Sequence, residues 1–472
     1  MIRAVIAKEL RTFSRSGVFL ALSCAIFTLI IAASLLSAQR LATFERERDM
    51  AEHIDEQVWE SQGARNPHAA AHFSRYAFKP IPNLAAFDPG ITDYVGLAVW
   101  MEAHVQNPAV FRRAEDLGQA GQFANLSPAW VLQVLAPLFL FLVLFGAISG
   151  EREDGTLKQT LAAGAGTRTL LLGKLVSACM AIGVVAIPAV LLGLWTSSSA
   201  TNDAALSDTW VRAFGLVILY ALYFIGLGGL ALGISALCRD RRSALLTLVA
   251  LWAVSVVLLP RVGGAVAATL FPQPEPTQLL AELESVSAAF QKDTAYREKM
   301  DADILAQYGV DTIDALPVSY VGYRLQKSEE HSNPLFDAFY GRVNALHSQQ
   351  QSVLDALSVL SPVLAIQTLS SGLAGTDRFH QIDFTQAAEM HRRKIIKQLN
   401  NDLFLNGAKE DGPYLSDPTL WEAVANLDYA APPISGFARR YLPSALILLF
   451  YAVFGVVCAV TVMKRAQSRV AA

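Results

Sequence analysis

Glu151-Arg152-Glu153-Asp154-Gly155-Thr156-Leu157 lies between two apolar runs, residues 128–149 and 175–196, and neither run contains a formally charged side chain. Charged side chains between two stretches long enough to cross a bilayer cannot lie in the hydrocarbon. The stretch 151–157, here called the first loop, is therefore predicted to be a short connection at the water interface of a membrane protein.

Composition supports a polytopic membrane protein. Of the 472 residues, 53% are hydrophobic and only 17% are charged, whereas an ordinary globular enzyme is less apolar. The formal net charge of −3 gives no basic field and argues against nucleic acid as the main partner. Cys24, Cys179, Cys238 and Cys458 fall in or beside apolar runs, so no disulfide framework is expected.

The predicted fold class is an all-α polytopic membrane protein with six transmembrane helices and two extracytoplasmic, mainly helical insertions. The predicted segments, in chain order, are a cytoplasmic amphipathic helix (1–16), span one (17–38), the first extracytoplasmic insertion (39–127), span two (128–149), a cytoplasmic loop (150–174), span three (175–196), span four (213–237), span five (243–261), the second extracytoplasmic insertion (272–440), span six (441–463) and a cytoplasmic tail (464–472).

The N-terminus allows alternative interpretations. Residues 2–15 place apolar side chains near one face, which is typical of a helix lying along a membrane surface, but a basic tail that only sets topology is the alternative. The next apolar run, 17–38, is longer than the ~7–15 residues of a signal-peptide core, so a span is favoured over a cleaved signal.

The positions of lysine and arginine predict the orientation of the spans. The turn at 197–209 contains neither residue, whereas the ends and the other short loops are rich in both. By the positive-inside rule, both termini are cytoplasmic and the two long polar regions face outward. The basic residues on the predicted cytoplasmic side are Arg3, Lys8, Arg11, Arg15, Arg152, Lys158, Arg168, Lys174, Arg239, Arg241, Arg242, Lys464, Arg465 and Arg469.

No strong catalytic or nucleotide-binding motif occurs in the sequence. The stretch nearest to a phosphate loop, 164–175, has Arg168 where the G-x-x-x-x-G-K-[ST] pattern needs its first glycine, and Leu175 where it needs a hydroxyl. No ionisable residue lies at mid-depth in a predicted span, which argues against an ion-coupled transporter. The sequence therefore assigns no catalytic residue and no cofactor to this chain.

Two groups of polar residues are candidates for metal or catalytic sites. His68 and His72 are four residues apart, a spacing that puts two imidazoles on one helix face, as metal ligands require. No Glu general base or Cys accompanies them, so two solvated histidines are the favoured interpretation and no metal ligand is assigned. The second group is also interpreted as solvated surface: His380, Asp383, Glu389 and His391.

Two further features concern packing. Gly229 and Gly233 lie on one helix face and are predicted to let another helix approach closely, within one chain or between two. The run 361–369 is apolar but short, so it is expected to be a core or membrane-surface segment.

Motifs in three places resemble a known family. The first loop, followed by Leu172-Gly173-Lys174, resembles the coupling segment of ABC-2 type (type V) ABC transporter permeases, where an acidic–basic–acidic triplet precedes G-T-L and then a G-K pair. Lys8-Glu9-Leu10 resembles the connecting helix of that family. The third stretch resembles a subgroup with an extra outer domain, DUF3526: Leu360-Ser361-Pro362 through Ala374-Gly375-Thr376-Asp377, with Phe384 and Ala388-Glu389.

The resemblance implies a permease subunit of an ABC exporter in a bacterial inner membrane. ATP and Mg²⁺ would be bound by a cytosolic ABC ATPase dimer, and a second permease copy or a sibling permease would complete the complex; a periplasmic partner is compatible with the outer domain. Gly155 permits a sharp reversal of the chain, and Thr156 is expected to cap the next helix. The residues implied in ATPase coupling are Glu151, Arg152, Glu153, Asp154, Gly155, Thr156 and Leu157, and secondarily Arg239, Arg241 and Arg242.

A second interpretation stays open at the level of sequence. The chain could be a membrane-anchored binding or assembly protein that acts through its extracytoplasmic domains while the spans are passive. A passive anchor has no need of an ATPase partner, so this partner distinguishes the two interpretations. Neither interpretation identifies a substrate.

Overall fold

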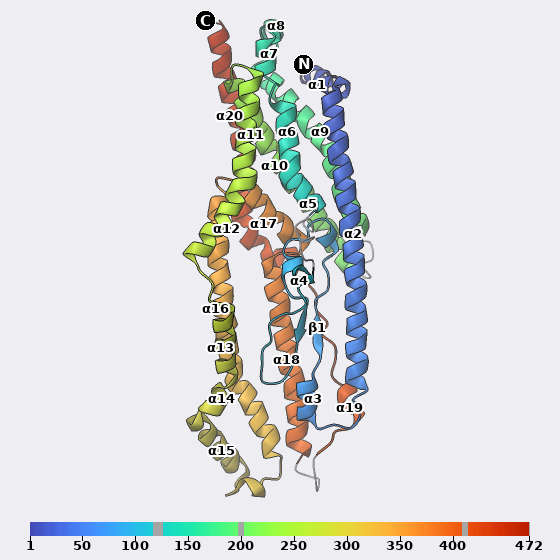
Figure 1. The fold of residues 1–472 in the computed structure, drawn as a ribbon, viewed down its shortest axis with the longest axis vertical. Helices are drawn as coiled ribbons and strands as arrows, with labels where there is room; N and C mark the ends of the chain where they lie inside the picture. The colour runs from blue at the N-terminus through green and yellow to red at the C-terminus, as the bar shows by residue number, and fades with distance from the viewer. Residues whose placement is uncertain (117–125, 197–202, 408–413, 472) are drawn as a thin grey trace.

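The chain forms an elongated set of helices (Figure 1). The computed structural model describes residues 1–116, 126–196, 203–407 and 414–471. Within these residues, six helices are long and apolar enough to cross a membrane: Gly17–Glu60, Pro128–Glu153, Thr167–Pro188, Asp208–Leu237, Arg241–Leu270 and Ala438–Arg465. The protein is therefore a mostly helical, multi-pass membrane protein, as the sequence predicts.

Both ends of the chain lie at the same end of the molecule (Figure 1). α1 (Ile2–Arg15) and the C-terminal portion of α20 (Ile434–Ala471) lie there, beside α7 (Ser149–Glu153) and α8 (Thr156–Ala162). α15 (Thr294–Tyr308) lies at the opposite end. An even number of spans returns the chain to the side on which it began, so this arrangement agrees with six crossings.

Five predicted spans extend beyond their expected bounds, including span five, which runs from Arg241 to Leu270, and span six, which lies within α20. The first belongs to α2 (Gly17–Glu60), which continues past residue 38 because residues 39–60 contain no Gly or Pro to end a helix. α9 (Thr167–Thr196) begins before residue 175, and α10 (Asp203–Leu237) before residue 213. The predicted turn at 197–209 lies partly outside the described residues.

Spans two and five each contain a π-helical segment, which leaves backbone carbonyls without their usual partners. In span two, Pro137 has no N–H to donate to the carbonyl of Gln133. The hydroxyl of Tyr223 donates to that carbonyl at 3.0 Å, and Nε1 of Trp252 donates to the carbonyl of Val134 at 2.8 Å. The segments are α5 (Pro128–Trp130), η4 (Val131–Leu135) and α6 (Ala136–Leu144), then α11 (Arg241–Trp252), η5 (Ala253–Leu258) and α12 (Leu259–Leu270).

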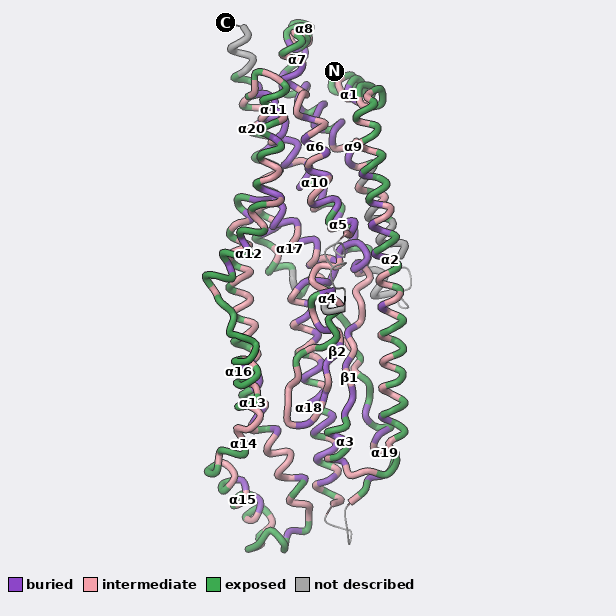
Figure 2. Tube along the Cα trace, in the orientation of Figure 1, coloured by how far each residue is buried: buried purple, intermediate pink, exposed green. Residues whose placement is uncertain are grey.

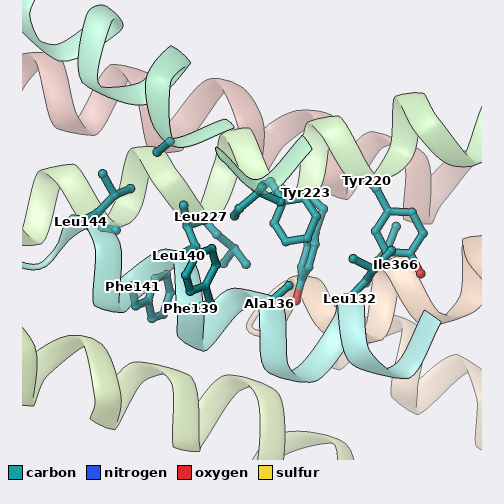
Figure 3. Packing of buried hydrophobic residues seen from close by; sticks show 14 of the residues in the cluster. Leu132, Ala136, Phe139, Leu140, Phe141, Leu144, Tyr220, Tyr223, Leu227 and Ile366 are labelled. Carbon is teal, nitrogen blue, oxygen red and sulfur yellow. The ribbon is translucent and has the colours of Figure 1, made fainter. Parts of the chain in front are cut away.

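The apolar core of the membrane region is built around α6 and α10. Figure 3 shows Leu140 and Leu144 of α6 packed near Leu227 of α10, and Ile366 of α17 (Pro362–Ala374) close to Tyr220. All five side chains belong to one buried cluster. α17 contains the run 361–369, and its burial agrees with the predicted core segment.

α10 and α20 pack closely along their lengths within one chain. A Cβ on Gly229 would collide with the backbone of Gly455 and Val456, and Gly233 lies against Ala459. Small residues permit this close approach. The face that carries Gly229 and Gly233 is therefore occupied by the sixth span of the same chain.

The two polar regions of the sequence pack into one domain at the end of the molecule away from both termini, here called the outer domain (Figure 1). Nε1 of Trp59 donates to the carbonyl of Trp421 at 3.0 Å, and Nε1 of Trp421 donates to the carbonyl of Gly63 at 2.7 Å. Figure 2 shows buried positions along α18 (Arg378–Asn406), whereas the outer half of α2 is largely exposed. This domain has its own buried apolar cluster, separate from that of the spans.

The outer domain is mainly helical, as predicted, but it also contains a small antiparallel sheet. β1 (Tyr76–Phe78) pairs with β2 (Ala98–Trp100), with Ala77 opposite Val99. Each strand has only three residues, too few to show an alternating pattern in the sequence. The other elements are α3 (Pro67–Phe73), η1 (Asn83–Ala86), η2 (Thr92–Tyr94), α4 (Arg113–Asp116), α13 (Pro276–Ser287), α14 (Ala289–Lys292), η6 (Ile313–Ala315), α16 (Tyr320–Leu357) and α19 (Pro418–Glu422).

Candidate functional site

Four charged side chains from three helices meet at the end of the molecule that holds both termini. Lys174 of α9 has a side chain only 2% exposed, and its Nζ donates to Oε1 of Glu9 at 2.6 Å and to Oε1 of Glu151 at 2.9 Å. Nζ of Lys8 forms an ion pair with Glu151 and lies 3.4 Å from Oε1 of Glu9. This charged cluster joins α1, α7 and α9.

A glycine beside the cluster allows α1 to approach α9. A Cβ on Gly173 would lie 2.6 Å from Cγ1 of Val5, which is closer than van der Waals contact. The absence of a side chain there lets α1 lie directly on α9, so Glu9 is opposite Lys174. The Gly173-Lys174 pair thus combines close packing with a buried charge.

The cluster contains two positive and two negative side chains, so its formal charges balance. Partial burial lowers the pKa of Lys8, but the hydrogen bonds and charges of Glu151 and Glu9 outweigh it and raise that pKa above its usual value. Loss of one partner would leave an opposite charge buried without compensation, which costs more than the intact pair contributes. Lys174 itself lies within α9, where the sequence predicted the end of a loop.

The first loop is bonded to residues 238–242, here called the second loop. Nη2 of Arg152 donates to the carbonyl of Ala236 at 2.7 Å, and Nη1 donates to that of Cys238. These are carbonyls at the C-terminal end of α10, where a cation is favoured. Arg241 forms an ion pair with Asp154. The two loops therefore form one bonded unit.

The chain reverses sharply between α7 and α8. Gly155 has a φ of 74°, a left-handed conformation that glycine adopts without strain. The prediction that Thr156 caps α8 is wrong, because Gly155 occupies the cap position and Thr156 is the first helical residue. Oγ1 of Thr156 instead donates to the carbonyl of Glu151 at 3.3 Å. Leu157 is buried in the apolar core and anchors α8.

The residues expected to contact an ATPase differ in how far their side chains are exposed. Glu151 and Arg152 are partly buried and bond within the chain, and Leu157 is buried, so these three position the loops. Glu153 and Asp154 also bond to Arg241 but remain exposed. Two further polar residues of α8, Lys158 and Gln159, are exposed but were not among the predicted coupling residues. In the sequence they are marked only as polar residues next to the motif. The exposed members of the predicted set are Glu153, Asp154, Thr156, Arg239, Arg241 and Arg242.

The second polar group of the sequence does not form one site and is not a solvated surface. His380 is 1% exposed, with Nδ1 2.6 Å from Oδ1 of Asp377. Glu389 is buried and accepts from Arg392 at 2.8 Å. The other two members have partners elsewhere: Asp383 accepts from the hydroxyl of Tyr429, and Nε2 of His391 lies 3.0 Å from the carbonyl of Ala425. Each therefore serves packing in the outer domain.

Comparison with protein families assigns a portion of this outer domain. Residues 278–414 match the family model described as Domain of unknown function (DUF3526). The chain carries a DUF3526 domain. The match runs from α13 through α18 and includes the stretch from Leu360 to Glu389 that carried the resemblance, so this portion of the prediction is confirmed. No curated protein is significantly similar to the chain.

Proposed function

We propose that the protein is the transmembrane permease subunit of an ABC transporter that exports its substrate. Its two loops at the end that holds both termini would contact a cytosolic ATPase dimer in a bacterial inner membrane. ATP and Mg²⁺ would be bound by that partner, and a second permease copy or a sibling permease would complete the complex.

The charged cluster is the observation that carries the proposal. Lys174 bonds simultaneously to Glu9 of α1 and to Glu151 of the first loop, and Arg152 bonds the same loop to the end of α10. A displacement of α8 would therefore move α1, α9 and α10 together. Such rigid attachment is what a loop needs if it is to transmit force from a partner to the spans.

The surface available to that partner lies on α8 and beside it. Glu153, Lys158 and Gln159 are exposed, while Leu157 on the same turn is buried. A short helix with one anchored face and one polar face can enter a groove of another protein and remain fixed to its own chain. Contact with the ATPase is therefore assigned to the exposed residues, and Glu151 and Arg152 hold the loop in place.

Co-purification tests this assignment. The chain would be co-expressed with a candidate cytosolic ABC ATPase and isolated by an affinity tag. The double variant E153R/K158E should retain at least tenfold less ATPase than wild type, whereas K299E, which changes an exposed lysine on α15 at the opposite end, should retain as much. Equal retention by both variants would refute the contact.

A second candidate function is favoured by a cavity in the outer half of the molecule. A cavity of about 530 Å³ lies where the outer helices meet the spans, and it is lined by Gln133, Asp355, Gln367, Arg378 and Arg440 among others. A cavity of this size, lined by both polar and apolar side chains, could hold a ligand of a membrane-anchored binding protein. In that case wild type would retain no ATPase in the same experiment.

A further inference from the structure

Three histidines from two separate segments converge in the outer domain. His68 and His72 lie one turn apart on α3, with ring centroids 4.6 Å apart. His104 follows β2, and its ring centroid is 5.2 Å from that of His68 and 5.3 Å from that of His72. One nitrogen atom of each ring lies within 4.8 Å of the corresponding atoms of the other two.

The backbone on both sides of the group is fixed by hydrogen bonds. Asn66 caps α3, because its Oδ1 accepts from the N–H of His68 at 2.9 Å. The N–H of Ala103 donates to the carbonyl of Ala71 at 3.0 Å and so ties the segment that carries His104 to α3. His104 itself has a φ of 67°, a left-handed conformation that is unfavourable for a residue with a side chain.

A buried carboxylate holds His104 in that conformation. Oε1 of Glu329, on α16, accepts from the N–H of His104 at 2.6 Å and lies 3.0 Å from its Nδ1. Oε2 of Glu329 accepts from Nη1 of Arg392 at 2.9 Å. The guanidinium of Arg392 is always charged, and its ion pair with Glu329 keeps this carboxylate ionised at neutral pH.

An ionised carboxylate at Nδ1 determines which nitrogen of His104 is available. A carboxylate can only accept, so Nδ1 carries the hydrogen and Nε2 keeps its lone pair. Carboxylate–histidine pairs of this kind orient the imidazole ligands of metal ions and increase their basicity. Ca²⁺ and Mg²⁺ bind mainly to oxygen ligands, whereas a group of three imidazoles suits zinc, copper or nickel.

The other two rings are also suited to act as ligands. Nδ1 of His68 is buried and has no hydrogen-bond partner among the described residues. His72 is exposed and provides a route for an ion from solvent.

We propose that His68, His72 and His104 bind one divalent transition-metal ion of the zinc class, with a fourth position open to water or to a further ligand. In a tetrahedral site with Zn–N bonds of about 2.0–2.1 Å, the ligand nitrogens are about 3.4 Å apart. The rings thus need to approach by roughly an ångström, which side-chain rotation supplies. The ion would link α3 to the segment after β2, whatever the spans transport.

Metal binding by the full-length chain tests the proposal. The protein would be purified in detergent without a polyhistidine tag, stripped with a chelator and titrated with Zn²⁺, and separately with Co²⁺, whose visible spectrum reports a tetrahedral site. Wild type should bind one Zn²⁺ per chain in the presence of excess Mg²⁺ and Ca²⁺. H68A, H72A and H104A should each weaken binding at least tenfold, and E329Q should weaken it by about 10–100-fold.

H53A is the matched control, because His53 is exposed on α2 and lies outside the group. H72A replaces an exposed side chain, so it reports on the site even if the variants at the more buried positions unfold; thermal unfolding of each stripped protein checks this. A stoichiometry far below one ion per chain, or equal affinities for H72A and H53A, would overturn the proposal.

Discussion

Nζ of Lys174 lies 2.6 Å from Oε1 of Glu9, although 165 positions separate the two residues in the chain. The N-terminal helix is therefore fixed to the third span. It would move with that span and with the first loop, which Lys174 also contacts. A helix that merely lay on the membrane surface would move independently of both.

Replacing Lys174 with methionine should destabilise the protein strongly. K174M keeps the length of the side chain but leaves the carboxylates of Glu9 and Glu151 without their buried partner, which costs about 3–5 kcal/mol. K158M changes an exposed lysine of α8, and its free energy of unfolding should be within about 0.5 kcal/mol of that of wild type. Thermal unfolding in detergent compares the two. Equal unfolding temperatures would show that the cluster contributes nothing to stability.

Adding a methyl group at Gly173 should separate α1 from α9. The new Cβ would lie 2.6 Å from Cγ1 of Val5, and overpacking of this kind costs about 1–3 kcal/mol. G264A is the control, since no atom lies within 4 Å of a Cβ built there, and alanine in an exposed helix stabilises by about 0.5–1 kcal/mol relative to glycine. G173A should also make residues 1–16 more accessible to protease. G173A should lower the free energy of unfolding, whereas G264A should raise it. An increase for G173A would contradict the close contact of α1 with α9.

The stability of the outer domain should rise as the pH is raised from 8 towards 10. Lys79 is buried, and this burial lowers its pKa to about 8 despite the opposing charge of Asp377. Between that value and the ordinary pKa of 10.5, the unfolded chain binds more protons than the folded chain, so the free energy of unfolding increases with pH. Unfolding at pH 7.5 and 9.5 would be compared for wild type and K79M, which should show a smaller increase. The same increase in both would exclude Lys79 as its source.

The sequence predicted the membrane region of the fold well, because hydrocarbon imposes strong local rules. Uncharged runs such as 128–149 identified the six spans, and the short apolar run at 361–369 was correctly distinguished from a span. The bounds were less accurate, since Lys174 looked like a loop residue until its pairing with Glu9 was visible. The π segment around Gln133 depends on Tyr223 and Trp252 from other helices, which no local pattern reveals.

In the candidate sites, too, the sequence predicted local patterns but not contacts between distant segments. The first loop could be found from its charges, but the sequence could not separate Glu151, which is partly buried and pairs with two lysines, from Glu153, which is exposed and accepts from the N–H of Arg241. His68 and His72 were visible as a pair, whereas His104 lies far along the chain and joins them only through the small sheet and Glu329. Contacts between distant segments require the three-dimensional fold.

ATP hydrolysis by a reconstituted complex would show whether the two loops couple this chain to an ATPase. The chain and a candidate cytosolic ABC ATPase would be placed together in proteoliposomes, and hydrolysis would be compared for wild type, E153R/K158E and K299E. We expect wild type and K299E to stimulate the ATPase equally and E153R/K158E to lose most of this stimulation. Equal stimulation by all three, or none by wild type, would contradict this coupling.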